Sequence, residues 1–408
     1  MRMSQRYSSL ASTAILAAVI ISSGCSRSES PQQSHSTLRF WHFWSEPGHK
    51  AVLKDLIATF ENENNCTVEL TELSWNDGKA KLQAAFNSGA PPDVVELGSD
   101  WVAQFSGAGV LGELAQIDTT KFLQYSLAPG RYTGKLYAAP WVVDTRVLFV
   151  NKSLAQKAAL DSTTTLDELL LSCERVQSAG ALGWGANGAD AHRLYKKILP
   201  FLWTCGGDVL DSRGRCVLNS PQNVRALTLY ADLARTGMIE TQRQLDATFL
   251  QGRIGVWNSG SWLIKKIKNA KNLSVTAMPF PGIDSRPGIS FAGGEYLATS
   301  AASANKKLAA KLVEYLVSGA VSKRFCLLVP EAGFPAATDA FCDPALMSDP
   351  LKAVFARQLQ SARMTPVHPR WLDIEAVLEG CVVRVLLGEA SPEEALRVAH
   401  EEIIEIVS

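Results

Sequence analysis

The residues best suited to binding chemistry are tryptophans and charged side chains that stand where predicted strands or helices end. The chain has ten tryptophans, and an indole offers a flat apolar face and one N–H donor. That combination suits a ligand with C–H faces and hydroxyl rims, such as a sugar. Packing within the core is the alternative for many of these indoles.

Two further groups could bind hydroxyls. Asp144 and Arg146 alternate with valines, which places both on one face of a strand. A paired carboxylate and guanidinium hold each other in place and keep spare donors and acceptors, although a purely structural ion pair is the alternative. Gly293-Gly294 allows close approach of backbone to ligand, and Glu295 could accept hydroxyl bonds, with a plain turn as the alternative.

Residue patterns for catalysis or metal binding are sparse. The six histidines are dispersed and no Cys-x-x-Cys occurs, so we expect no metal and no cofactor. Gly183-x-Gly185-x-x-Gly188 has dinucleotide-binding spacing but follows a helical pattern. Ser303-x-x-Lys306 lacks its companion motifs and better fits a helix N-cap at Ser303. Without a nucleophile and base, we expect no enzyme.

An alternating α/β pattern must position these residues. The strand-like segments are residues 38–43, 67–73 and 93–97, and the helical ones are residues 50–62 and 80–87. That order predicts a parallel sheet with covering helices, in which ligands lie beyond the carboxyl ends of the strands. Asp100 follows the third strand, so its carboxylate should face such a site; a loop or capping role is the alternative. Thr165 with Glu168, and Ser391 with Glu394, form capping boxes that start helices.

The N-terminus and the charge balance bear on location and partners. Lys+Arg and Asp+Glu both total 40, and no basic stripe occurs, which argues against nucleic-acid binding. Arg2 and Arg6 precede an apolar run that ends in Ser22-Ser23-Gly24-Cys25, so residues 1–25 are predicted to be an export signal. Residues 26–37, rich in Ser, Gln and Pro, are predicted to form a flexible tether.

Export would place the other seven of the eight cysteines where disulfides can form. Cys205 and Cys216 flank a predicted hairpin whose arms they could join, and Cys326 with Cys342 is the next plausible pair. The odd number leaves at least one thiol without a partner in the chain.

Several phrases, in order along the chain, resemble the sugar-binding branch of the extracellular solute-binding proteins of ABC importers (family 1, maltose-binding-protein-like). They are Pro91-Pro92-Asp93-Val94-Val95 with Ser99-Asp100-Trp101, the segments 134–152 and 249–262, and Phe291-Ala292-Gly293-Gly294-Glu295-Tyr296-Leu297. The resemblance covers the chain from about Leu38 to its end. It implies an α/β, two-lobed periplasmic-binding-protein-like fold, each lobe a mainly parallel sheet flanked by helices. Residues 38–143 and 296–338 would form lobe 1, and residues 144–295 and 339–408 lobe 2, with the ligand between the lobes.

The resemblance also implies roles for individual residues. Trp262 aligns with the family's main stacking aromatic, and the aspartate that matches Asp100 accepts sugar hydroxyls. The other residues expected at the ligand are Trp44, Ser45, Glu46, Trp141, Asp144, Arg146, Trp257, Gly293, Gly294, Glu295 and Trp371. Cys25 ends a sequence like a bacterial lipobox and would carry a lipid, with ordinary signal cleavage as the alternative.

The expected function is therefore that of an extracytoplasmic, lipid-anchored receptor in the cell envelope. It would bind an oligosaccharide or glycoside as a monomer and deliver it to the transmembrane subunits of an ABC permease. A receptor of the same fold for a non-sugar solute, such as a glycerol phosphodiester, peptide or polyamine, is the first alternative. An envelope enzyme is the second.

Overall fold

The computed structural model describes residues 35–156 and 163–408. The export signal, Cys25 and most of the tether lie outside the described residues. The first strand, β1 (Ser36–His42), already includes the last two residues assigned to the tether. Among the helices of the described residues, none combines the length and apolar character needed to cross a membrane.

The first lobe is built on a sheet that starts with the predicted alternation. β1, β2 (Cys66–Glu72) and β3 (Val94–Gly98) pair in parallel, with α1 (Pro47–Asn64) and α2 (Gly78–Asn87) as the intervening helices. All five elements are confirmed within a few residues. The order across the sheet is β13-β6-β12-β3-β1-β2, where the later strands are β6 (Ala138–Thr145), β12 (Ser290–Thr299) and β13 (Phe334–Pro335).

The second lobe is built on a five-stranded sheet of order β11-β7-β10-β8-β9. Its strands are β7 (Val147–Asn151), β8 (Leu182–Asn187), β9 (Met238–Glu240), β10 (Ile254–Ser259) and β11 (Val275–Met278). β8 pairs in parallel with β9 and β10, whereas β7 is antiparallel to both of its neighbours. β12 is likewise antiparallel to β3 and β6 in the first sheet, so both sheets are mixed. The motif of Gly183 and Gly185 lies within β8 and not at a strand-to-helix turn.

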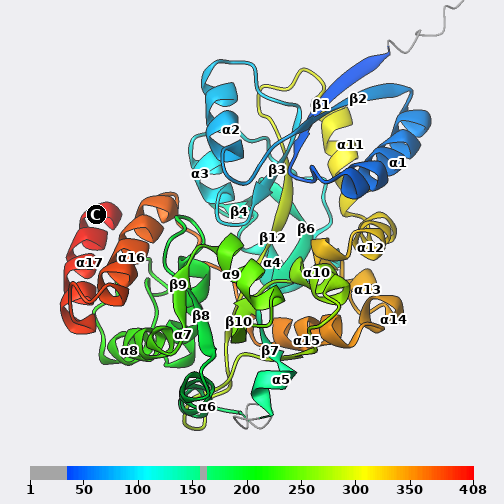
Figure 1. Ribbon diagram of the computed structural model, residues 1–408. Helices are drawn as coiled ribbons and strands as arrows, with labels where there is room; N and C mark the ends of the chain where they lie inside the picture. The colour runs from blue at the N-terminus through cyan, green and yellow to red at the C-terminus, as the bar shows by residue number, and fades with distance from the viewer. Residues whose placement is uncertain (1–34, 157–162) are drawn as a thin grey trace, which may run out of the picture. The chain divides into compact units, whose positions relative to one another are not determined.

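Helices cover both sheets (Figure 1). α1, α11 and α12 contact one another, and α11 packs on β6 and β12; α7 and α8 pack with the C-terminal helices α16 and α17. The remaining elements are α3 (Val102–Gly107), η1 (Thr119–Lys121), α4 (Gln124–Leu127), β4 (Arg131–Tyr132), β5 (Lys135–Leu136), α5 (Lys152–Ala155), α6 (Leu166–Ser178), α7 (Tyr195–Thr204), α8 (Pro221–Arg235), α9 (Gln242–Leu250), α10 (Leu263–Asn269), α11 (Lys306–Val317), α12 (Gly319–Leu328), η3 (Pro330–Ala332), α13 (Thr338–Phe341), α14 (Pro344–Met347), α15 (Pro350–Leu359), β14 (Ala362–Arg363), α16 (Trp371–Leu386) and α17 (Pro392–Val407).

The starts of three helices can be compared with the caps predicted from the sequence. The capping box at α6 is confirmed, because the Thr165 hydroxyl accepts from the Glu168 N–H while Glu168 accepts from the Thr165 N–H. Ser391 likewise caps α17. The N-cap expected at Ser303 is wrong. α11 begins after Asn305, and the Ser303 hydroxyl donates to Asp93, 2.6 Å away.

The chain passes from the first sheet to the second at Arg146 and returns before β12. Arg146 alone separates β6 in the first sheet from β7 in the second. The return occurs before Ser290, since β12 is in register with β6 from Ala292 opposite Thr145 to Ala298 opposite Ala138. Asp144 and the segment 290–295, expected in lobe 2, therefore belong to the first sheet.

Both expected disulfides are wrong, because every cysteine of the described residues is free. The hairpin exists, but its register places Leu210 opposite Cys216. Cys205 instead lies at the C-terminal end of α7, buried. Cys326 is buried inside α12, whereas Cys342 is exposed at the end of α13.

Candidate functional site

The crossing strands bring a set of charged and aromatic side chains together, which we call the Arg146 cluster: Asp144, Arg146, Trp262, Phe291 and Glu295. An Arg146 guanidinium nitrogen lies 3.1 Å from the Asp144 carboxylate, and the two side chains are only 11% and 13% exposed. The guanidinium carbon lies 4.5 Å from the centre of the Trp262 ring and 5.3 Å from that of Phe291. The expected ion pair is therefore present, and both aromatic rings flank it.

Burial changes the protonation of the cluster's carboxyl groups. It raises the pKa of Glu295 to about 8; Asp144 adds to the rise, while Arg146 and Lys196 oppose it. Glu295 is therefore mostly protonated at neutral pH and can donate a hydrogen bond as well as accept one. Burial also raises the pKa of Asp144, but the adjacent Arg146 acts against this. The cluster thus presents donors from Arg146 and Glu295 beside an Asp144 carboxylate that accepts.

Asp100 follows β3 as expected and is almost buried. Its carboxylate accepts a hydrogen bond of 3.0 Å from the Tyr195 hydroxyl, which comes from the start of α7. Because β3 belongs to the first sheet and α7 packs in the second lobe, this bond joins the two lobes. The Tyr195 ring lies edge-on to Phe291 at 6.1 Å, so Asp100 and the Arg146 cluster are linked through one aromatic contact.

The start of α7 is held by two glutamates of α16. Glu379 accepts the backbone N–H groups of His192 and Tyr195 at 2.8 and 3.1 Å. Glu375 lies 2.5 Å from the His192 ring nitrogen, and burial raises its pKa to about 7 while the bond to His192 opposes the rise. These partners lie more than 180 residues apart in sequence, so no local pattern pointed to them.

Gly293 and Gly294 allow close packing between neighbouring strands. A Cβ on Gly294 would collide with the Val142 carbonyl oxygen of the neighbouring strand, and one on Gly293 would lie 2.8 Å from the Phe291 ring. The Gly294 carbonyl accepts from the Ser99 N–H at 3.0 Å, next to Asp100. The glycines thus let β12 hold the loop after β3 against the crossing strands.

Three of the indoles expected at the ligand are core residues in the structure. Trp141, Trp257 and Trp371 are at most 1% exposed. Trp141 stacks on Phe325 at 4.6 Å, and the Trp257 N–H donates to Asp246 at 2.8 Å. Trp141 and Trp257 lie within β6 and β10, and Trp371 is the first residue of α16, so neighbouring Gly, Pro or Asn residues gave no sign of this burial.

The other expected residues are more accessible. Trp44 is half-buried with its ring edge-on to Phe325, 5.0 Å away, and Ser45 and Glu46 are exposed at the start of α1. Trp262 is partly exposed, but its ring rests on the Gly260 backbone, where a Cβ would collide with it. With Arg146 at 4.5 Å, the proposed stacking surface of Trp262 is already contacted by protein.

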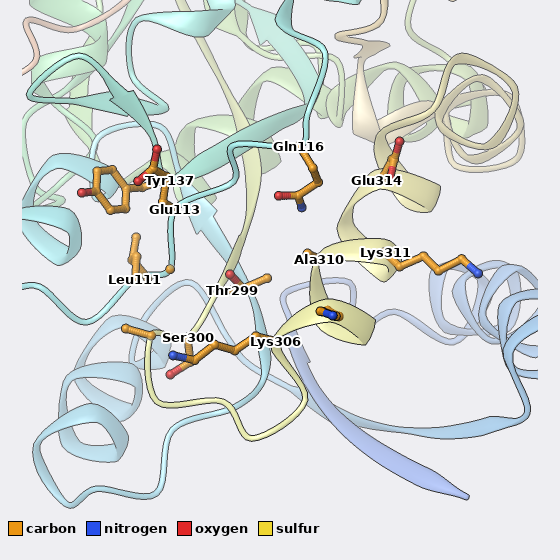
Figure 2. Close-up of a pocket in the computed structure, with 13 residues that line it drawn as sticks. Leu111, Glu113, Gln116, Tyr137, Thr299, Ser300, Lys306, Ala310, Lys311 and Glu314 are labelled. Atoms are coloured by element: carbon orange, nitrogen blue, oxygen red, sulfur yellow. The ribbon is translucent and has the colours of Figure 1, made fainter. Parts of the chain in front are cut away.

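A surface hollow of about 620 Å³ lies apart from these residues. Figure 2 shows that its lining comes from the segment 111–116, the end of β12 and α11. Thr299, in this lining, is four residues beyond Glu295 on β12, or roughly 13 Å at about 3.3 Å per residue. Among the described residues, no group of three or more His, Cys, Asp or Glu side chains could hold a metal ion.

Two α/β lobes, with charged and aromatic side chains where the chain crosses between them, match the architecture of a two-lobed solute-binding protein. The chain belongs to the bacterial extracellular solute-binding protein family, whose model matches residues 44–321.

Named relatives match along most of the chain. The maltodextrin-binding protein MdxE of Bacillus subtilis is 25% identical over 412 residues, which cover 96% of this chain and 97% of that protein. The GacH receptor of Streptomyces glaucescens, solved unliganded and with acarbose, has a TM-score of 0.81 and 26% identity, covering 91% and 98% of the two chains. UgpB of Mycobacterium tuberculosis, solved with glycerophosphocholine, has a TM-score of 0.80 at 21% identity, covers 91% and 98%, and shares the fold.

Proposed function

We propose that this protein is the extracytoplasmic substrate-binding component of an ABC importer and binds an oligosaccharide or glycoside between its lobes. The observation that carries the proposal is the Arg146 cluster, joined to Asp100 through Tyr195. It places an acceptor carboxylate, a guanidinium and a protonated carboxyl beside aromatic rings. Sugar hydroxyls both donate and accept, so they can satisfy all three groups at once. The sugar ligands named for MdxE and GacH support the same substrate class.

Delivery would follow from closure of the lobes around the sugar. We further propose that Cys25 carries a lipid that tethers the protein on the outer side of a membrane, and that the protein acts as a monomer. The transmembrane subunits of the permease would then recognise the closed form. The protein itself would catalyse no reaction.

An anionic solute is the second candidate, because UgpB shares this fold. A phosphodiester would need cationic groups that are not already neutralised by the protein. Arg146 is paired with Asp144, whereas the Lys196 ammonium lies over the Tyr195 and Phe291 rings at 5.3 and 5.8 Å. At the Arg146 cluster itself, one paired guanidinium and one ammonium suit hydroxyls better than a phosphate.

The test is mass spectrometry of the native protein for a co-purified ligand. It is combined with thermal unfolding in the presence of malto-, galacto- and chito-oligosaccharides and of glycerophosphocholine. We expect one saccharide series to raise the melting temperature and to make the protein more compact in solution scattering. Asp100→Asn should lose most of that shift, whereas Asp232→Asn, a partly exposed aspartate of α8, should keep it. A shift with glycerophosphocholine alone would contradict the sugar assignment.

A further inference from the structure

One aromatic ring that contacts Trp101, the residue after Asp100, presents an open face. Trp75 is 45% exposed and is the one aromatic side chain among the exposed large hydrophobic residues of the described chain. It lies in the loop between β2 and α2. Trp262, in contrast, has Gly260 under its ring and Arg146 at 4.5 Å. The surface available for stacking is therefore at Trp75.

Trp75 rests on a packed aromatic base. Its ring stacks on Phe43 with centroids 4.1 Å apart and an interplanar angle of 21°, and Trp101 lies against it at 5.4 Å. Phe43 and Trp101 are only 5% and 6% exposed. Gly78 packs closely against Phe43, since a Cβ at this glycine would lie 2.5 Å from the Phe43 ring. One face of the indole is thus fixed by the protein and the rest is left to solvent.

The Trp75 loop also faces the second lobe. The Asn76 side-chain oxygen, in the residue next to Trp75, accepts from Arg193 at 3.1 Å, just before the start of α7. Two residues further on, Tyr195 reaches Asp100 from the same segment. Burial lowers the pKa of Lys79, at the start of α2, while the charges of Glu375 and Asp100 oppose this shift. The start of α2 therefore also lies near these two carboxyl groups. The open ring therefore lies at the edge of the site that contains Asp100.

We propose that Trp75, held by Phe43 and Trp101, is a stacking platform for a further sugar ring of an extended saccharide bound at Asp100 and the Arg146 cluster. This inference rests on the proposed function and deepens it: the ligand is an oligosaccharide long enough to reach the Trp75 loop. A C–H face of the outer ring would cover the open indole, with Asn76 and Lys79 beside it to meet ring hydroxyls. A protein partner that docks on the exposed indole is the competing explanation.

The experiment measures Kd by calorimetry for malto-, galacto- and chito-oligosaccharides of two to five rings. In the series that binds, Trp75→Ala should raise the Kd of the longest members by about tenfold and that of the two-ring member by less than about twofold. Trp75→Phe should retain most of the affinity. Trp75→Met, which still covers Phe43 but has no aromatic face, should behave like Trp75→Ala. Leu328→Ala, at an apolar residue of α12 that is 55% exposed, is the control and should leave every Kd unchanged.

Iodide quenching of tryptophan fluorescence provides an independent measurement. The five-ring member should reduce the iodide-accessible fraction in the wild type but not in Trp75→Phe. Unchanged affinities of Trp75→Ala at every length would overturn the platform while leaving the sugar-binding function standing. If that variant binds normally but no longer stimulates its permease, the indole is a protein-docking residue and the inference is wrong. Absence of binding by the wild type to all three series would overturn the proposed function and the platform together.

Discussion

The Arg146 guanidinium lies over the Trp262 ring, 4.5 Å from its centre, while one of its nitrogens is 3.1 Å from Asp144. A side chain held from two directions is preorganised, so a hydroxyl bound to Arg146 does not have to order it. The same arrangement means that a sugar which stacks on Trp262 must displace the guanidinium or bind beside it.

Arg146→Ala should destabilise the protein by about 3 kcal/mol or more, because it leaves the buried Asp144 carboxylate without its partner. The double variant Asp144→Asn/Arg146→Ala should recover part of this loss, since it removes the uncompensated charge. Urea unfolding of both single variants and the double variant measures the coupling. Strictly additive losses would show that the two side chains do not stabilise each other.

Tyr195→Phe removes the hydroxyl that donates to Asp100 and preserves the buried ring. The lost bond leaves an almost buried carboxylate oxygen without its donor, so the free energy of unfolding should fall by about 1–3 kcal/mol. Tyr137→Phe, at the surface hollow, is a control with an expected effect near zero. Equal stability of Tyr195→Phe and the wild type would mean that water replaces the hydroxyl.

Stability should fall with rising pH because of Glu295. Its pKa is about 8 in the native protein and about 4.3 in an unfolded chain, so the native state binds more protons between these values. The stabilisation is complete below the lower value and is lost as the pH rises through about 8. Glu295→Gln cannot ionise, so its unfolding free energy, measured in urea from roughly pH 5 to roughly pH 9, should decline less than that of the wild type. Parallel curves for the two proteins would contradict the assignment of Glu295 as a buried carboxyl with a raised pKa. Glu389→Gln is the control.

The free thiols make a separate prediction. In the native protein Cys342, the exposed cysteine among those described, should react first with a thiol reagent, and Cys342→Ser should lack this fast phase. Peptide maps prepared without reductant should contain no fragment that joins Cys205 to Cys216 or Cys326 to Cys342. Detection of either linked fragment would show that the pairing expected from the spacing forms after all.

Local sequence signals predicted the elements of the first lobe but not the contacts between distant segments. β1 to β3 follow from alternation and apolar runs, and the start of α6 from the Thr165 capping box, because these signals act within a few residues. The bonds of Glu375 and Glu379 to His192 join α16 to the start of α7. These bonds form only when helices far apart in sequence pack together, so the periodicity of the sequence does not predict them.

The tryptophans show a second limit. Chemistry and family order singled out Trp141, Trp257 and Trp371 as cleft walls, yet the structure encloses all three. Whether an indole faces a ligand or a core depends on what packs against the strand, helix or loop that bears it. Trp75, which lies outside the segments that resemble the family, is the ring that remains open. Residue type was therefore a poor guide to exposure.

Arg146 is also the sole residue between β6 and β7, and this gives it a mechanical role. At this crossing, any swing of one sheet against the other must be absorbed by the backbone torsions of Arg146 and its immediate neighbours. Its side chain meanwhile lies among Asp144, Trp262 and Phe291. If a solute binds at the guanidinium, as we propose, it contacts the residue of this crossing directly, so we expect its occupancy to influence how the two sheets are oriented there.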